Sequence, residues 1–250
     1  MKIVMPSRGR AGKCLTIQFI PDVTIVCSES EKDAYRKAYP KNEILVEPKT
    51  VNNIVRCREW LVEMFRNEDD LFMIDDDVFD VRRFFAVDNT NEKAKVTSPE
   101  EVREIIENTC FIAKQLGSQL WGYNNAINPV QYSGHEPIQL TGYLNCSYIG
   151  FVKGHDMVFN RKIVEGEDHY ISCMSIYKHR FHVRDCRWTF LTKENFKRDE
   201  GVQSYRNTAV MQKTTQYLQR LFGSNVVQSK RTTGIKEKLN EGERIVKFPF

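Results

Sequence analysis

Three consecutive aspartates, Asp75, Asp76 and Asp77, directly follow the apolar run LFMI at 71–74. Adjacent carboxylates repel one another, and each costs free energy when it leaves water without a partner. Their oxygens are the ligands that Mg²⁺ and Mn²⁺ prefer, and such a cation can hold the oxygens of a diphosphate. A solvated turn is the alternative, but a turn does not need an apolar lead-in. The pattern therefore favours a metal and phosphate site at the end of a buried strand.

A basic loop, PSRGRAGK, follows the first apolar run of the chain. It supplies a glycine that lets a backbone approach a ligand closely, and cations suited to a phosphate or a nucleotide base. A basic turn without a ligand is the alternative. Ligands of open α/β sheets bind at the carboxyl ends of the strands, so we expect this loop and the aspartates to share one site. The candidate residues in the loop are Pro6, Ser7, Arg8, Gly9, Arg10 and Lys13.

A third stretch whose residues could take part in catalysis is EGEDHY at 165–170. Gly166 marks a turn, and Glu167, Asp168 and His169 are candidate acid or base groups. The alternative is an ordinary helix start, because acidic residues are favoured in the first turn of a helix. Alongside the other two stretches, we favour the catalytic interpretation.

Short apolar strands and capped helices must position these stretches. Ser28 with Glu31 forms a capping box for one helix, and Asn53 can cap the next. Ser98 begins the clearest helix of the chain, which Gly117 ends. The strands expected between these helices are residues 2–5, 23–27, 43–46 and 71–74.

After residue 117 the pattern changes to strand-like segments with few helices between them. We predict one α/β domain over residues 1–250, with a mostly parallel αβα half at 1–117 and a mixed half at 118–250. The segments expected in the second half are strands within 120–132, 138–152 and 179–191, a helix within 205–222, and a polar, basic tail at 228–248.

Bulk composition is that of a globular enzyme or binding protein. The chain has 250 residues, of which 41% are hydrophobic and 28% charged. No apolar run approaches the roughly 18 residues that span a bilayer, and the N-terminus does not resemble a signal peptide. The odd count of seven cysteines, without CxxC spacing, favours reduced thiols and a cytoplasmic location. The net charge of +4 permits a polyanionic partner without demonstrating one.

Taken in order along the chain, the basic loop, the aspartate triplet and the GED stretch resemble a GT-A glycosyltransferase, with its Rossmann-like single domain. The resemblance implies that Asp75, Asp76 and Asp77 contact a nucleotide-sugar donor and its Mn²⁺ or Mg²⁺. It also implies that Asp168, or Glu167, removes the proton from the acceptor hydroxyl in an inverting displacement. The remaining residues expected to assist are Arg56 or Arg58 toward the donor and His182 as an extra metal ligand.

The stretches MPSRGRAGKC and IDDDVFDVRRF resemble a narrower group, the phage-type and TET-associated glycosyltransferases. This resemblance implies a UDP-sugar donor, an acceptor of hydroxymethylated pyrimidine in DNA, and action in the cytoplasm of an infected cell. Basic residues expected at DNA phosphates are Arg82, Arg83, Lys178, His179, Arg180, Arg184, Arg187, Lys197, Arg198, Lys230, Arg231, Lys236 and Lys238. Aromatic residues expected to stack on a displaced base are Phe84, Phe85, Trp121, Tyr123, Tyr132 and Trp188.

Three other functions stay open at this point. A glycosyltransferase acting on a protein or a glycan would have the same donor motifs. A nucleotidyltransferase also combines a nucleotide-binding first loop with metal-binding carboxylates, although PSRGRAGK fits its glycine-rich loop only in part. A nucleic-acid-binding module without catalysis would use the carboxylates merely to cap a turn.

Overall fold

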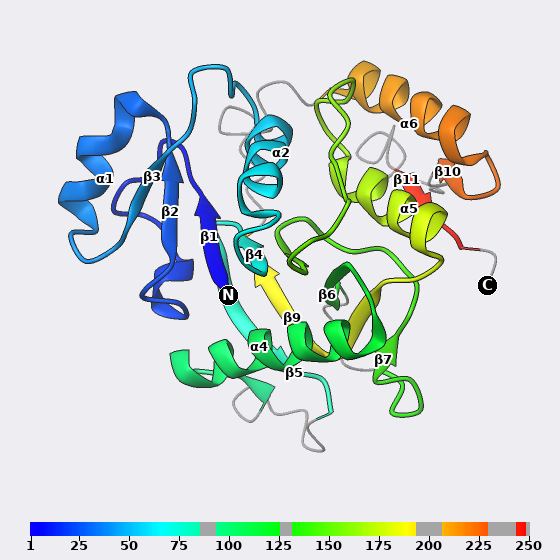
Figure 1. The fold of residues 1–250 in the computed structure, drawn as a ribbon, viewed down its shortest axis with the longest axis horizontal. Coiled ribbons are helices and arrows are strands. Elements are labelled where there is room, and N and C mark those ends of the chain that lie inside the picture. Colours follow the sequence, from blue (N-terminus) through cyan, green and yellow to red (C-terminus); the bar gives the residue numbers. More distant parts are fainter. Residues whose placement is uncertain (86–93, 126–131, 194–206, 230–243, 249–250) are drawn as a thin grey trace, which may run out of the picture.

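Four short parallel strands build the N-terminal part of the sheet in the order β3-β2-β1-β4 (Figure 1). In β4, Phe72 and Ile74 join the core on one face of the sheet, whereas Leu71 and Met73 join the core on the other. Strands buried on both faces need apolar residues at every position, which explains the unbroken apolar runs. The strands are β1 (Lys2–Pro6), β2 (Thr24–Cys27), β3 (Ile44–Val46) and β4 (Leu71–Ile74).

The computed structural model describes residues 1–85, 94–125, 132–193, 207–229 and 244–248. Within them, the predicted strands of the N-terminal half are all confirmed, with ends that differ by a residue at most from those expected. The later segments complete a mixed α/β domain, as predicted. None of the described helices is both long enough and apolar enough to cross a membrane.

Helix caps predicted from the sequence are mostly confirmed. The side chain of Asn53 accepts from the Arg56 amide at 3.0 Å at the start of α2 (Ile54–Phe65). Ser98 accepts from the Glu101 amide at 3.3 Å, and α4 (Pro99–Leu116) ends at Gly117, whose φ is 75°.

The capping box at Ser28 is wrong. Its hydroxyl donates to the Glu31 side chain at 2.7 Å instead of accepting from the helix, because a 3₁₀ turn over Glu29–Glu31 precedes α1 (Lys32–Ala38). A second short 3₁₀ turn, η1, lies at Thr16–Gln18 after the basic loop.

The second half of the chain extends the sheet with mixed directions. β8 (Tyr148–Phe151) runs antiparallel between β4 and β6 (Leu120–Asn124), and β9 (Val183–Thr192) runs parallel to β6. β5 (Val78–Arg83), which the sequence did not predict as a strand, pairs antiparallel with β9, as does the short β7 (Ile138–Gln139).

Helices cover both faces of this sheet. Helix α4 packs with one core, whereas α2 and α5 (Glu167–His179) pack with the other (Figure 1). The C-terminal elements are α6 (Thr208–Phe222) and a two-stranded sheet of β10 (Val227–Ser229) and β11 (Arg244–Val246). β10 contacts α6 and β11 contacts α5, so these two strands lie beside the last two helices of the described chain.

Candidate active site

The aspartate triplet lies at the carboxyl end of β4, and two other segments hold its backbone. The Asp75 amide donates to the Ser147 carbonyl at 2.8 Å, in the loop before β8. From the loop after β1, the Leu15 amide donates to the Asp76 carbonyl at 2.8 Å, and the Thr16 hydroxyl donates to the Asp75 carbonyl at 2.6 Å. The triplet is therefore held between the first loop of the chain and the loop that leads to β8.

Asp76 joins the triplet to the basic loop. Its buried carboxylate accepts from the Ser7 hydroxyl and, at 2.6 Å, from Arg10 Nη1. The Ser7 hydroxyl also lies 2.7 Å from the Tyr35 hydroxyl of α1. Burial raises the pKa of Asp76, although Ser7 and Arg10 act in the opposite direction. The carboxylate of Asp76 therefore holds the basic loop in place through Ser7 and Arg10.

Asp77 is the member of the triplet whose carboxylate has the weakest contacts with other side chains. Its side chain is 21% exposed, and its nearest cation, Arg10 Nη1, lies 3.8 Å from Oδ2. Burial, followed by the charges of Asp75 and Asp76, raises the pKa of Asp77 to about 7. A carboxylate in this condition gains from a cation that approaches it.

Arg58 joins the end of β4 to the start of α5. Its guanidinium, on the buried face of α2, donates from Nη2 to Asp75 Oδ1 at 2.7 Å and from Nη1 to Glu167. Burial opposes the charge of Arg58, but Asp75 and Glu167 raise its pKa well above the usual value. Arg58, which was predicted with Arg56 to assist at the donor, therefore contacts one carboxylate from each of the two acidic motifs.

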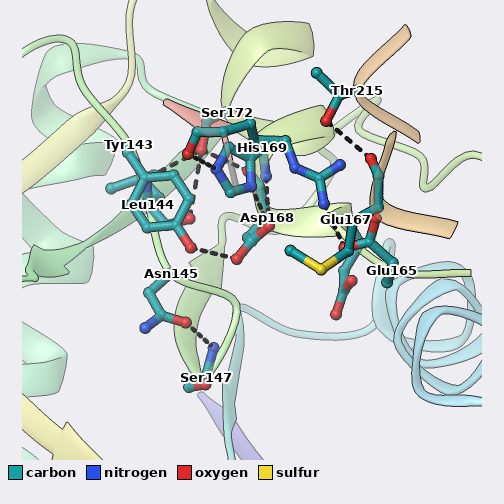
Figure 2. Close-up of polar contacts among 12 residues, drawn as sticks. Tyr143, Leu144, Asn145, Ser147, Glu165, Glu167, Asp168, His169, Ser172 and Thr215 are labelled. Carbon is teal, nitrogen blue, oxygen red and sulfur yellow. Dashed lines mark hydrogen bonds and ion pairs between the residues drawn. The ribbon is translucent and has the colours of Figure 1, made fainter. Parts of the chain in front are cut away.

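The first turn of α5 carries the two acids predicted for catalysis. Gly166 precedes it with a φ of 74°, as a turn glycine should, and Glu167 is buried against Arg58. Asp168 Oδ1 lies 2.7 Å from Nδ1 of His169, and Oδ2 accepts from the Tyr143 hydroxyl (Figure 2). Burial acts to raise the pKa of Asp168, but His169 and these hydrogen bonds lower it below the usual value. Asp168 is therefore an ionised, oriented carboxylate at neutral pH.

Tyr143 contacts one of the two acids of α5, and no sequence motif predicted it. It lies in the loop between β7 and β8, and its hydroxyl bonds the carboxylate of Asp168. Burial, together with the charge of Asp168, raises the pKa of Tyr143 well above its usual value, which keeps the hydroxyl protonated as a donor. One signal was available: the strand-like stretch 138–152 contains Gly142, which favours a turn.

The family of the chain follows from its sequence. A family model described as TET-Associated Glycosyltransferase matches residues 1–201. The chain belongs to the TET-associated glycosyltransferase family. It is accordingly a glycosyltransferase. No curated protein matches it significantly in sequence.

Three solved structures resemble this TET-associated glycosyltransferase at a distance. A197 from STIV is 13% identical, with a TM-score of 0.39, over 78% of this chain and 87% of that one. TarS from S. aureus is 11% identical, with a TM-score of 0.44, over 88% of this chain and 40% of that one. A putative nucleotide-diphospho-sugar transferase from Desulfovibrio desulfuricans G20 is 10% identical, with a TM-score of 0.40, over 89% and 99% respectively.

The structure does not bring His182 to the triplet. Strand register places Val183 level with Phe72 in the sheet, three strands away from β4, which is about 14 Å at the usual strand spacing. His182 is fully buried, and its Nε2 lies 2.7 Å from the Gly142 carbonyl. It is a core residue of the glycosyltransferase, and its assignment as a metal ligand is wrong.

The other basic residues predicted at the donor differ in their surroundings. Arg8 is paired with the buried Glu47, and Arg56 is paired with Glu59 at 3.2 Å. Lys13 is exposed, next to Gly12 and close to Arg10 in the same loop. Of the cations in the loop, Arg10 contacts the triplet, whereas Arg8 and Arg56 lie in ion pairs with other carboxylates.

Several aromatic residues predicted to stack on a base cannot do so. Trp121 and Tyr123 are fully buried in the core between the sheet and α4, and Phe84 is 3% exposed. Tyr132 is half-buried. Phe85, which is 44% exposed, meets Trp188 edge to face at 5.2 Å, so Phe85 is the most exposed ring among the described candidates.

Many of the basic residues predicted at DNA already have protein partners. Arg187 is paired with the buried Asp185 at 2.7 Å, and Lys178 with Asp156 at 2.9 Å. Arg184 donates to Gln139. Arg82 and Arg83 are paired with Asp80 and Glu101, and His179 is paired with Asp156. Six further candidates lie outside the described residues: Lys197, Arg198, Lys230, Arg231, Lys236 and Lys238.

The carboxylate oxygens of the triplet are the possible metal ligands at this site. Among the described residues, no group of three or more His, Cys, Asp or Glu side chains is arranged around a common point. Mg²⁺ sites commonly use only one or two carboxylates and complete the shell with substrate phosphates and water. Asp77, with its raised pKa and partial exposure, and Asp75, engaged through only one oxygen, fit that pattern.

Proposed function

We propose that this glycosyltransferase transfers a sugar from a nucleotide-diphosphate sugar, such as a UDP-sugar, to the hydroxyl of a hydroxymethylpyrimidine in DNA. The observation that carries the proposal is the Arg58 bridge. It joins Asp75, at the strand end where donors bind in α/β sheets, to Glu167, in the first turn of α5. One buried cation between these two acids supports a single site with a donor side and an acceptor side.

The donor side would consist mainly of residues 1–117. The loop Pro6, Ser7, Arg8, Gly9, Arg10 and Lys13 would hold the base and the diphosphate, with backbone access at Gly9, whose φ is 68°. Arg10 is already fixed by Asp76, so its guanidinium is pre-oriented for a phosphate oxygen beside the triplet.

A divalent cation, Mn²⁺ or Mg²⁺, would be held by Asp75 and Asp77. When bound, it would neutralise charge on the departing nucleotide diphosphate. The raised pKa of Asp77 supports this assignment, because a nearby dication favours the ionised carboxylate.

The acceptor side would lie in residues 118–250, where Asp168 would act as the base. Asp168 takes the proton of the acceptor hydroxyl while the hydroxyl oxygen forms a bond to the anomeric carbon. The bond from that carbon to the diphosphate breaks, and its electron pair leaves with the nucleotide diphosphate. Tyr143 and His169 support this role because they orient the carboxylate. Attack from the face opposite the leaving group would invert the anomeric centre.

The choice of DNA as acceptor rests on the family description, TET-associated. Hydroxymethylated pyrimidines carry the primary hydroxyl that this chemistry needs, and an enzyme that reaches them must extrude the base or act on a single strand. A glycan or protein acceptor is the alternative that the test below must separate. The same proposal includes that the enzyme is encoded by a phage and acts in the cytoplasm of the infected cell.

Product analysis tests the function. The protein is incubated with Mn²⁺, a panel of UDP-sugars and DNA that contains hydroxymethylcytosine or hydroxymethyluracil, with unmodified DNA of the same sequence as control. After digestion, mass spectrometry of the nucleosides should show a hexose-type mass addition only on the hydroxymethylated base. Asp168→Asn should lose about 100-fold or more in rate, in the range of a general base. Equal transfer to unmodified DNA, or transfer only to a glycan or protein acceptor, would overturn the DNA proposal.

A further inference from the structure

The end of the chain is fixed to the start of α5 by a buried ion pair. Arg244, the first residue of β11, pairs through Nη2 with Glu165. The two side chains are only 2% and 3% exposed. Two charges leave water only where close pairing and further contacts compensate for the lost hydration. Such a pair is therefore a specific junction and not an incidental surface contact.

The guanidinium of Arg244 also occupies the space beside Gly166. A Cβ atom added at Gly166 would lie 2.8 Å from Arg244 Nη1, closer than real side chains come. The φ of 74° at this residue separately favours glycine. Arg244 therefore packs directly on the residue that precedes the first turn of α5.

The backbone of Arg244 contacts the same turn at a second point. Its carbonyl oxygen lies 3.3 Å from Nε2 of His169, whose Nδ1 lies 2.7 Å from Asp168 Oδ1. The imidazole thus stands between β11 and the carboxylate. Because its two nitrogens contact one oxygen each, the ring plane is set jointly by Arg244 and Asp168.

We propose that Arg244 is a positioning residue, which fixes the first turn of α5 and orients Asp168 through Glu165, Gly166 and His169. The proposal rests on the catalytic role proposed above for Asp168. The family match covers residues 1–201, so the contacts of Arg244 come from a strand that lies outside the matched region. The C-terminal strand would then be part of the active-site architecture of this chain.

Nuclear magnetic resonance of the histidine rings tests the positioning without any assay of transfer. The chain has five histidines, so selective ¹⁵N labelling gives few signals, and His169→Gln assigns the one of interest. In Arg244→Met the ring signals of His169 should shift, while those of His179, bonded to Asp156, stay in place. Arg244→Lys, which keeps the charge, should return the His169 signals most of the way. Unchanged His169 signals in Arg244→Met would overturn the proposal.

Steady-state kinetics supply the second readout. Arg244→Met should lower kcat by roughly 10- to 100-fold, the scale of a small misplacement of a catalytic group, with the KM for the donor unchanged. Ile245→Ala on the same strand, whose side chain is 36% exposed, is the matched control and should keep wild-type kcat. If Arg244→Met does not fold, Glu165→Gln must give the same two effects. A kcat equal to wild type in a folded variant would overturn the positioning role. A wild-type protein that transfers no sugar would instead overturn the proposed function, and the His169 signals would then decide the positioning alone.

Discussion

At the scale of single residues, Arg58 is the group on which the site depends most. It neutralises two acids, Asp75 and Glu167, that the fold brings together in a buried region. Removing one partner of a buried ion pair leaves an uncompensated charge, which costs about 3–5 kcal/mol. We therefore expect Arg58→Met to lower the free energy of unfolding by about that amount in urea titrations.

The matched control for Arg58 is Arg161, which pairs with Glu59 at 2.6 Å but is 64% exposed. Exposed ion pairs contribute at most about 1 kcal/mol, so Arg161→Met should change the free energy of unfolding by that or less. An Arg58→Met protein as stable as Arg161→Met would show that the bridge does not hold the two motifs together.

Two buried histidines predict how stability depends on pH. Burial lowers the pKa of His155 and of His182 from 6.5 to about 4. Below pH 6.5 these two histidines bind protons in the unfolded chain but stay neutral in the folded chain. Their contribution to stability therefore falls as the pH drops, and the loss is complete near pH 4. The histidine contribution to the free energy of unfolding should therefore decrease from pH 7 to pH 5, by on the order of 1–2 kcal/mol per histidine. Asp77, whose pKa is raised, contributes with the opposite sign over the same range.

Replacing one of these histidines checks the source of the effect. His155→Phe should remove the contribution of His155, on the order of 1–2 kcal/mol, from the change in the free energy of unfolding between pH 7 and pH 5. Replacing the exposed His135 with Gln should leave that change as it is in the wild type. A slope that His135→Gln reduces as much as His155→Phe would assign the effect to surface charge.

At the scale of elements, α2 matters because it carries Arg58, and its start is fixed by one side chain. Asn53 accepts from the Arg56 amide at 3.0 Å. Loss of such a cap costs about 1 kcal/mol, so Asn53→Ala should lower the free energy of unfolding by that amount. Asn67→Ala, at an exposed position after the other end of α2, should have little effect. Equal effects of the two changes in urea titrations would contradict the cap.

The same scale shows what the sequence can predict. The four parallel strands and the caps at Asn53 and Ser98 follow from local patterns, because apolar runs and cap residues act within a few positions of themselves. The strand β5 was missed because its charged residues, such as Asp80, interrupt the apolar pattern, and only pairing with β9 makes it a strand.

Contacts between distant parts of the chain were beyond the local patterns. Arg58 and Glu167 lie 109 positions apart, and Glu165 and Arg244 lie 79 apart. The sequence proposed the acids of both motifs as site residues, but no spacing rule connects them to a particular arginine. The prediction of His182 as a metal ligand failed for the same reason, because its position in a strand-like stretch did not reveal which end of the sheet it occupies.

At the scale of the whole molecule, the donor should stabilise the folded protein through the N-terminal half. A ligand that binds only the folded state at 100 times its dissociation constant adds about 2.7 kcal/mol, and each kcal/mol raises the Tm by roughly 2–4 °C in a protein of this size. We therefore expect a saturating UDP-sugar with Mn²⁺ to raise the Tm by roughly 5 °C or more.

The metal-dependent part of that shift reports on the triplet. The UDP-sugar with EDTA should raise the Tm less than with Mn²⁺, and Asp77→Asn should remove the difference, because Asp77 is the carboxylate with the fewest protein partners and a raised pKa. Asp22→Asn, which removes an exposed carboxylate that pairs with Arg103 on α4, is the control and should keep the full shift. A shift that is the same in Mn²⁺ and EDTA would show that the donor binds without the cation. The aspartates would then serve the basic loop and Arg58 alone, and the end of β4 would be an electrostatic junction without a metal.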